Sequence, residues 1–365
     1  MTGDKDTHLP ASASALTEPR ERLWQALGDG DETRAVAVVR DALGTAGPGP
    51  SAAGQLRAAA ERVLLELIAP VQERVGRAWA ADEITVAREH AATAISERCV
   101  AAVADATAAA RRVPCAGRVL VACVDGEWHA LPARLVSEVL RLRGWRVDHL
   151  GAHVPTGHLV EHARSTGTQA VLLSSSIPTL LPGAHNAISA CRSAGLPVLA
   201  GGAAFGERGE YARPMRAAWA KDAADAAALL GRGLEPPTAH PVGLPDLDLP
   251  HLADQEYTMV RRSRHQLVRR TLADVEAGFP EMRRYSDYQH ERTVEDIDFI
   301  VGHLATALYV DDPALFTRFI RWTADVLAAR DVPPRCLIPA LESLLGQLKD
   351  FPRVAGVLTA ARDVL

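Results

Sequence analysis

The segment Asp125-Gly126-Glu127-Trp128-His129 places a carboxylate two residues before an imidazole. A neutral imidazole can bind a transition metal through one ring nitrogen, while a carboxylate on the other nitrogen fixes the tautomer and raises the basicity of the ring. Glu127 and His129 have the types and the spacing for such a pair. Taken alone, the triplet fits a solvated loop histidine better, so its meaning depends on the elements that position it.

Those elements predict an α/β fold. Apolar runs typical of buried strands alternate with helical stretches: strands at 118–124, 145–150, 170–174, 197–202 and near 217–220, and helices at 131–143, 156–165, 183–194 and 222–231. This alternation predicts a doubly wound parallel sheet, whose ligands lie at the carboxyl ends of the strands. The triplet follows the first strand and therefore lies at that edge. A dinucleotide-binding fold would carry GxGxxG here, and this sequence does not.

Small residues end two further strands at the same edge. Ser174 and Ser176 follow the third strand, and Gly201 and Gly202 follow the fourth. Small side chains there leave a slot into the sheet in which a flat base could lie. Ordinary turn chemistry is the alternative explanation for residues of these types at strand ends.

Together these motifs resemble the base-off, His-on cobalamin-binding domains of methionine synthase and its relatives, over about residues 17–233. That family carries Asp/Glu-x-His-x-x-Gly after its first strand, a serine motif after the third and Gly-Gly after the fourth. The resemblance implies a Rossmann-like domain at 113–233 in which His129 is the lower ligand of cobalt and Glu127 supports it. Pro132 stands where the family has its last glycine, and proline is tolerated in a first helical turn. The implied lining of the slot for the dimethylbenzimidazole tail is Ser174, Ser176, Gly201 and Gly202. Gly126, in the loop itself, is expected among the cofactor-binding residues.

Residues 17–112 predict a four-helix cap, with Thr85 as the N-cap of its last helix. Within it, Trp79, Glu89 and His90 taken singly fit a core aromatic, a first-turn acid and a surface histidine. Their joint spacing, Trp-x9-Glu-His, resembles the cap of the light-sensing, adenosylcobalamin-dependent transcriptional repressors. The resemblance implies that Trp79 packs on the adenosyl group, that Glu89 bonds it, and that His90 binds cobalt once the cobalt–carbon bond breaks. Residues 1–50 are too short and alanine-rich for the DNA-binding module of those repressors, so we expect no nucleic-acid partner.

A proline-rich linker, 234–250, precedes an all-helical third domain at 251–365. Its predicted helices cover 253–278, 293–310, 313–330 and 335–363, the last broken near Pro352. Their layout resembles a globin or a phycobiliprotein, and the whole chain resembles the photocobilins, in which a cobalamin photoreceptor is joined to a bilin-binding globin-like domain. The resemblance implies a bilin such as biliverdin, bound without a covalent bond although Cys336 is available. The expected contacts are arginines for its propionates and polar groups for its centre: Arg261, Arg262, Arg264, Arg269, Arg270, Tyr288, His290, Asp296 and His303.

Two other readings of the third domain stay open. It could only dimerise, with Tyr285, Tyr288 and Tyr309 as core or interface aromatics. It could instead be a haem globin with His303 or His290 as the proximal ligand.

The bulk composition excludes several classes of protein. Net charge is −5 over 365 residues, so no global field attracts nucleic acid or an anionic membrane. The five cysteines form no CxxC pair, which argues against zinc and disulfide frameworks. No apolar run approaches the ~18 residues of a membrane span, and the first residues, which we expect to form a frayed tail over 1–16, carry no signal peptide. We therefore expect a soluble, cytoplasmic protein.

These observations lead to one hypothesis and two alternatives. The hypothesis is a cobalamin-dependent photoreceptor, not an enzyme, with light-dependent assembly into a homodimer and a downstream protein that the sequence does not identify. The alternatives are a corrinoid methyl carrier for methyltransferases and a haem-globin/B12 sensor.

Overall fold

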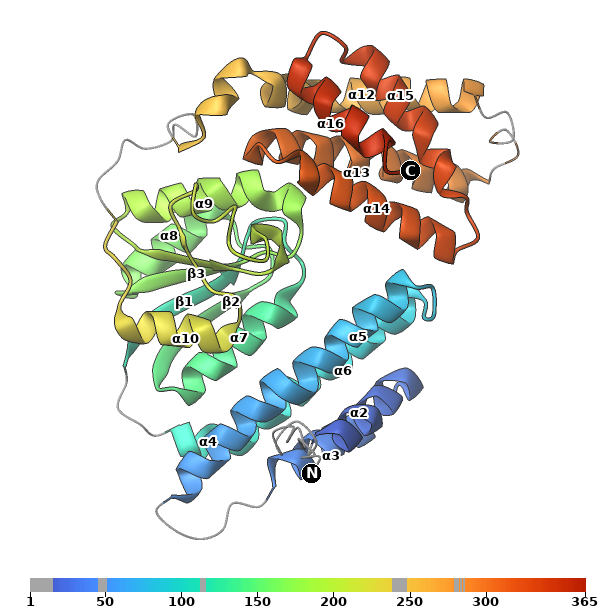
Figure 1. Cartoon of the computed structure of the whole chain (residues 1–365). Coiled ribbons are helices and arrows are strands. Elements are labelled where there is room, and N and C mark those ends of the chain that lie inside the picture. The colour runs from blue at the N-terminus through green and yellow to red at the C-terminus, as the bar shows by residue number, and fades with distance from the viewer. Residues whose placement is uncertain are drawn as a thin grey trace, which may run out of the picture.

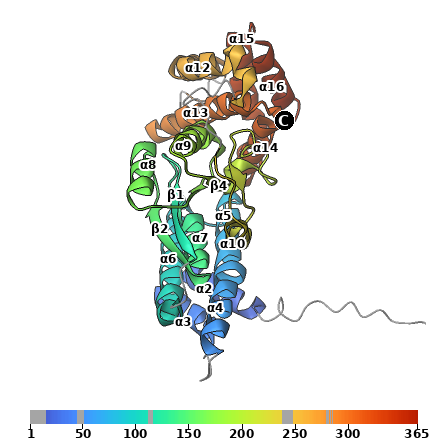
Figure 2. The ribbon, with the colours of Figure 1, turned by 90° about the vertical axis from the view of Figure 1, so that its left-hand side faces the viewer.

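The computed structural model describes residues 16–44, 51–111, 116–237, 248–278, 282, 284 and 286–365. Figure 1 shows three tiers: a cap of long helices, an α/β domain, and a C-terminal group of helices. Turned by 90°, the tiers stack along one long axis (Figure 2). Within the described ranges, no helix is long and apolar enough to cross a membrane.

The cap consists of helices whose apolar faces pack on one another. Its elements are α2 (Thr17–Asp29), α3 (Glu32–Leu43), α4 (Ala52–Arg62), a π-helical turn (Val63–Ile68), α5 (Ala69–Ala80) and α6 (Val86–Thr107), which a 3-10 turn (Ala108–Arg111) follows. The π-helical turn connects α4 to α5 directly. Pro70, which has no N–H to donate, lies just after it and disturbs the usual ladder there. As predicted, Thr85 caps α6, because its side chain accepts from the Arg88 N–H at 3.3 Å.

The α/β domain holds a five-stranded parallel sheet in the order β2-β1-β3-β4-β5. The predicted parallel, doubly wound sheet is confirmed. Its strands are β1 (Gly117–Cys123), β2 (Trp145–Gly151), β3 (Ala170–Ser174), β4 (Val198–Gly201) and β5 (Ala218–Trp219). Its helices are α7 (Ala130–Leu142), α8 (Thr156–Ser165), α9 (Leu181–Ser193) and α10 (Ala223–Arg232), with 3-10 turns η3 (Pro178–Leu180) and η4 (Ala203–Phe205).

Buried apolar residues form three cores, two of which join neighbouring tiers. The face of the sheet under α7 and α10 has its own core. The other side of α7 joins the core of the cap, through residues such as Leu131 and Val139. The opposite face of the sheet, under α8 and α9, shares one continuous core with the C-terminal helices, which runs from Leu120 and Ile188 to Leu304 and Phe316. The α/β domain is therefore packed on both sides by helices from other parts of the chain.

The C-terminal helices are α12 (Glu256–Gly278), α13 (Asp287–Val310), α14 (Pro313–Ala329), α15 (Ile338–Gln347) and α16 (Pro352–Arg362), with 3-10 turns at Pro250–Asp254 and Pro334–Leu337. The prediction placed the start of α13 at 293. A capping box formed by Ser286 and Gln289 starts the helix six residues earlier. The predicted break near Pro352 is present, and Pro352 begins α16. The globin-like arrangement stays a prediction. Much of the predicted linker (238–247), the predicted tail (1–15) and Tyr285 lie outside the described residues.

Candidate functional site

A buried carboxylate organises the loop after β1. Glu127 is fully buried, and one of its oxygens accepts from the backbone N–H of His129 at 2.9 Å and from His129 Nδ1 at 2.6 Å. Its other oxygen accepts from three donors of the loop after β3: the Ser176 N–H at 2.6 Å, the Ile177 N–H at 3.2 Å and the Ser175 hydroxyl at 3.2 Å. Burial alone would raise the pKa of Glu127, but these hydrogen bonds outweigh it and lower the pKa to about 2. Glu127 is therefore an ionised tie between two loops.

The imidazole of His129 is held on one side and open on the other. Its side chain is 59% exposed although its Nδ1 is bonded to a fully buried group. Because Glu127 accepts at Nδ1, the tautomer with a free Nε2 lone pair is the one favoured for ligand binding. The hydrogen bond to Glu127 raises the pKa of His129, and the negative charge of Glu89 on α6 adds to it. Glu89 lies in the first turn of α6, so the start of this helix faces the loop that carries His129.

The two loops meet because of the sheet topology. In the order β2-β1-β3-β4-β5, the connections from β1 and β3 leave in opposite directions, and this switch point is where open α/β sheets bind their ligands. Gly126, at φ +85°, makes the turn that leads into Glu127. Its N–H donates to His153 Nδ1 at 2.9 Å, which ties the loop to the end of β2.

The glycine pair after β4 is closely packed on the serine motif. A Cβ on Gly202 would lie 2.3 Å from the Ser175 carbonyl oxygen, and its φ of +99° also excludes most side chains. A Cβ on Gly201 would meet the Ala220 carbonyl oxygen at 3.4 Å. The structure therefore brings Gly201, Gly202, Ser174 and Ser176 to the edge where the sequence predicts them. Ser176 contributes its backbone N–H to Glu127 rather than its side chain.

The three predicted cap residues lie at facing ends of α5 and α6. Glu89 accepts from the Thr93 hydroxyl at 2.9 Å and pairs with His90 Nδ1 at 2.7 Å. His90 is 74% exposed. Trp79 is half-buried and lies one residue before the end of α5, close to the C-terminal helix α14.

Comparison with known protein families identifies this arrangement. Residues 19–104 match one family model described as a B12 binding domain, and residues 117–228 match a second with the same description. The chain carries two B12-binding domains. The first corresponds to the cap and the second to the α/β domain with the Glu127–His129 loop. The geometry fits a cobalt ligand, because the His129 ring is exposed while its Nδ1 is held by the buried Glu127.

The chain spans about half the length of the curated relatives that it matches, or less. The HTH-type transcriptional repressor CarA of Myxococcus xanthus is 30% identical over 155 residues, which cover 42% of this chain and 46% of the repressor. Dimethylamine corrinoid protein 1 of Methanosarcina acetivorans is 31% identical over 91 residues, 24% of this chain and 43% of that protein. Among solved structures, the monomethylamine corrinoid protein of Methanosarcina barkeri shares the fold with a TM-score of 0.50 at 19% identity, covering 60% of this chain and all of that one.

The residues predicted to contact a bilin lie in different surroundings. His303 is buried, its Nδ1 donates to the Phe299 carbonyl at 2.9 Å, and its ring stacks on Phe319 at 3.6 Å. Burial lowers the pKa of His303 to about 4, so its ring is neutral. His290 lies 3.7 Å from Glu276, and the side chain of Tyr288 is outside the described part of the chain.

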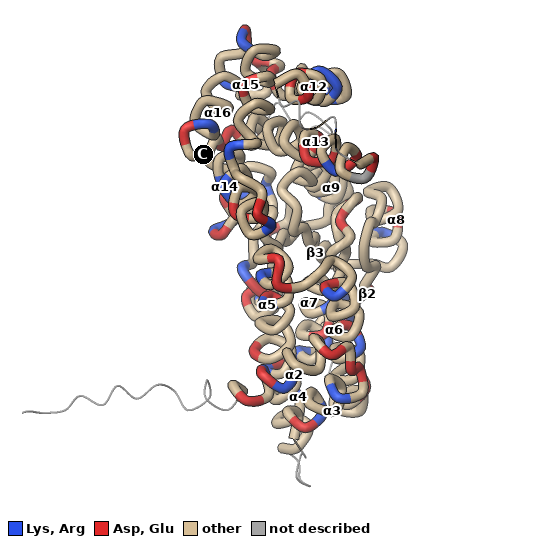
Figure 3. The backbone as a smooth tube through the Cα atoms, turned by 90° about the vertical axis from the view of Figure 1, so that its right-hand side faces the viewer, with Lys and Arg blue, Asp and Glu red and all other residues tan. Residues whose placement is uncertain are grey.

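The arginines of α12 have different surroundings. Arg264 pairs with Asp298 at 2.6 Å. The four others, Arg261, Arg262, Arg269 and Arg270, are exposed. Figure 3 shows basic positions along α12 in blue. Tyr309 is buried, and its hydroxyl forms a hydrogen bond of 2.8 Å with His185 Nδ1. This bond joins the C-terminal helices to the α/β domain.

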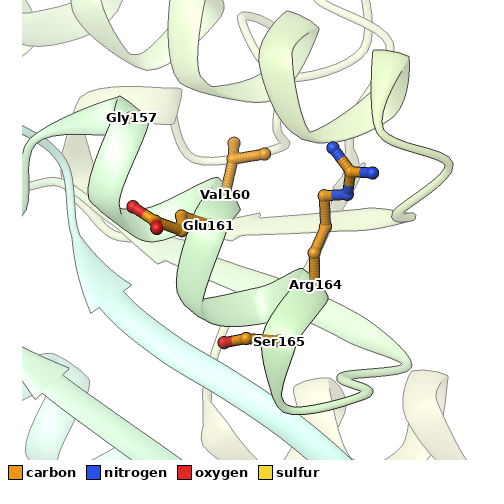
Figure 4. A pocket seen from close by; sticks show the side chains of 5 residues that line it. All are labelled: Gly157, Val160, Glu161, Arg164 and Ser165. Atoms are coloured by element: carbon orange, nitrogen blue, oxygen red, sulfur yellow. The ribbon is translucent and has the colours of Figure 1, made fainter.

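Several residues of the site were not found from the sequence. Ser175 and Ile177 hold Glu127, and the only signal for them was the triple serine that includes Ser175. Trp128, 70% exposed, stacks on His153 at 4.9 Å beside the His129 loop. A separate open pocket on α8 contains none of the predicted site residues (Figure 4); its lining is Gly157, Val160, Glu161, Arg164 and Ser165.

Proposed function

We propose that this chain is a cobalamin-dependent light sensor in which His129 is the lower axial ligand of cobalt. The observation that carries the proposal is the Glu127–His129 pair. A fully buried, ionised carboxylate fixes Nδ1 of an imidazole that is otherwise exposed at the ligand edge of the sheet. This is the arrangement by which a second residue orients a metal-binding histidine.

The cap supplies the groups for the upper side. Bound adenosylcobalamin would supply a cobalt–carbon bond that visible light breaks. Trp79 offers an aromatic wall, and Glu89 offers carboxylate oxygens to ribose hydroxyls. His90, which is 74% exposed beside Glu89, would supply a second imidazole to the cobalt.

The C-terminal helices are proposed to hold a bilin as a second chromophore, with His303, His290 and Tyr288 near its centre. What supports this is a neutral, buried His303 beside an aromatic stack and a row of exposed arginines on α12. Biliverdin added to the full chain is expected to give a red-absorbing complex that denaturation releases as free pigment. A sharp Soret band with haem, and no response to biliverdin, would point to a haem globin instead.

A corrinoid methyl carrier is the second candidate, because part of the chain is similar to corrinoid proteins in sequence and fold. The two candidates differ in what the cap must recognise. A light sensor needs Trp79, Glu89 and His90 around a large adenosyl group, whereas a carrier needs access to a small methyl group. The proposed output, light-dependent assembly of a homodimer, also belongs only to the sensor.

The test is a titration of the purified chain with adenosylcobalamin and with methylcobalamin in the dark, then under visible light. The proposal expects tighter binding of the adenosyl form, a light-induced spectral change, and a light-induced change in size by gel filtration. His90→Ala should alter the light product and leave dark binding unchanged. His158→Ala, which changes an exposed histidine of α8, is the matched control. An adenosyl complex that light leaves unchanged, with methyl transfer to an added thiol, would favour the carrier.

A further inference from the structure

The end of the cap that carries Trp79 touches the C-terminal domain. The rings of Trp79 and Trp322 on α14 lie 6.2 Å apart at 36°, within the range in which aromatic pairs attract each other. Trp322 is nevertheless 46% exposed, a large area for an apolar side chain. Trp79 and Trp322 come from separate domains and lie more than two hundred positions apart in the sequence.

A cation holds this contact in place. Arg330, at the end of α14, donates to the Trp79 carbonyl at 3.0 Å and to the Ala80 carbonyl at 3.3 Å. These are carbonyls of the last turn of α5, where the helix ladder ends. The Trp79 carbonyl also accepts from the Asp82 N–H at 3.1 Å. The guanidinium also lies 5.6 Å from the Trp79 ring and 3.6 Å from Asp82, a residue with φ +60° just beyond the helix. Arg330 therefore fixes both the helix end and the ring.

Trp322 is itself backed by a rigid aromatic row. Its ring is 6.3 Å from Phe319, which stacks on His303 and lies 6.5 Å from the fully buried Phe316. Phe316 belongs to the core shared with the α/β domain. Trp322 is thus packed against the aromatic row on one side and exposed on the other. The exposed side is free to pack against a flat ligand.

We propose that Trp322 determines specificity for the upper axial ligand: with Trp79 it forms a two-tryptophan wall against the adenosyl group, and Arg330 is the positioning residue. The inference rests on the proposed function, because it takes Trp79 as the adenosyl contact. It makes the third domain part of the cobalamin site. A methyl group offers no flat surface to pack against a tryptophan ring, so Trp322 should discriminate between cobalamins rather than bind them all.

The experiment compares dissociation constants of the full chain for adenosylcobalamin and methylcobalamin in the dark. Trp322→Ala should weaken adenosylcobalamin about tenfold, roughly the loss of one buried aromatic contact, and leave methylcobalamin within about twofold. Trp322→Phe should restore most of the discrimination. Arg330→Ala should weaken the adenosyl form and speed hydrogen exchange of the Ala81 and Asp82 amides without ligand. Arg321→Ala on the same helix is the exposed control.

Equal weakening of both cobalamins by Trp322→Ala, or no change in either, would overturn the inference. Trp322→Gln, judged by circular dichroism and thermal unfolding, separates a lost contact from a misfolded chain. The proposed function fails in a different way: the unmodified chain then shows no preference for the adenosyl form. If that preference exists and survives both Trp322→Ala and Trp322→Gln, only the role of Trp322 is wrong.

Discussion

Replacing Glu127 by glutamine tests the organisation of the site without changing its shape. The carboxylate accepts five hydrogen bonds, two from His129 and three from the loop after β3. An amide has one oxygen, so its NH₂ must face either the His129 donors or the backbone N–H groups of Ser176 and Ile177. Either way, buried donors face each other and lose their acceptor.

The lowered pKa of Glu127 sets the loss of folding stability that we expect for Glu127→Gln. Hydrogen bonding lowers the pKa of Glu127 from 4.5 to about 2, which corresponds to roughly 3 kcal/mol in favour of the folded, ionised carboxylate. Unsatisfied buried donors cost about 1–3 kcal/mol each, in the same range. We therefore expect Glu127→Gln to lower the free energy of unfolding at pH 7 by about 2–4 kcal/mol.

The contribution of Glu127 to folding stability depends on pH. A carboxylate whose pKa is lowered in the folded state contributes its full stability above pH 4.5 and loses it as the pH falls toward 2. Glu127 also raises the pKa of His129, so the difference between the unmodified chain and Glu127→Gln should grow as the pH falls through the raised pKa of His129 toward 6.5. It should then shrink below about pH 4.5, as Glu127 takes up its proton. Urea unfolding of the full chain, followed by circular dichroism at several pH values, measures it. Equal stability of the two proteins at pH 7, with cobalamin affinity unchanged, would refute the reasoning.

Three further predictions concern other parts of the molecule. Gly202→Ala should lower thermal stability by about 2 kcal/mol or more, since it adds a Cβ at 2.3 Å from the Ser175 carbonyl at positive φ; Gly201→Ala, with a contact at 3.4 Å, should cost far less. Tyr309→Phe removes the buried hydroxyl that bonds His185 and should destabilise the chain by about 1–2 kcal/mol in urea. His303 has a pKa lowered to about 4, so its neutral form stabilises the fold above pH 6.5 and this is lost as the pH falls to 4. His303→Gln should flatten the stability profile in that window, and an unchanged profile would contradict the assignment.

The parallel sheet and its ligand edge could be predicted because they depend on local pattern. Buried strands of β-branched and leucine residues, separated by amphipathic helices, leave few alternatives to a doubly wound sheet. The position of the Glu127–His129 pair follows from that topology alone. The start of α13 was missed because a capping box at Ser286 and Gln289, within a polar stretch without apolar period, decides it.

The partners of the site could not be predicted in the same way. Glu127 is satisfied by backbone N–H groups of Ser176 and Ile177, and every residue type except proline carries that donor. Trp322 and Arg330 lie in a different domain from Trp79, so only the packing of three tiers brings them together. Sequence spacing contains no signal for contacts of that kind.

The central claim is that His129 of this chain is bound to cobalt beneath the corrin. Electron paramagnetic resonance of the cob(II)alamin complex tests it directly, because the axial nitrogen splits the cobalt lines. With uniformly ¹⁵N-labelled protein and unlabelled cobalamin, each three-line pattern from ¹⁴N should become a two-line pattern from ¹⁵N, and His129→Ala should abolish this change. A three-line pattern that labelling leaves intact would mean that the benzimidazole of the cofactor is still the ligand, and would contradict the account.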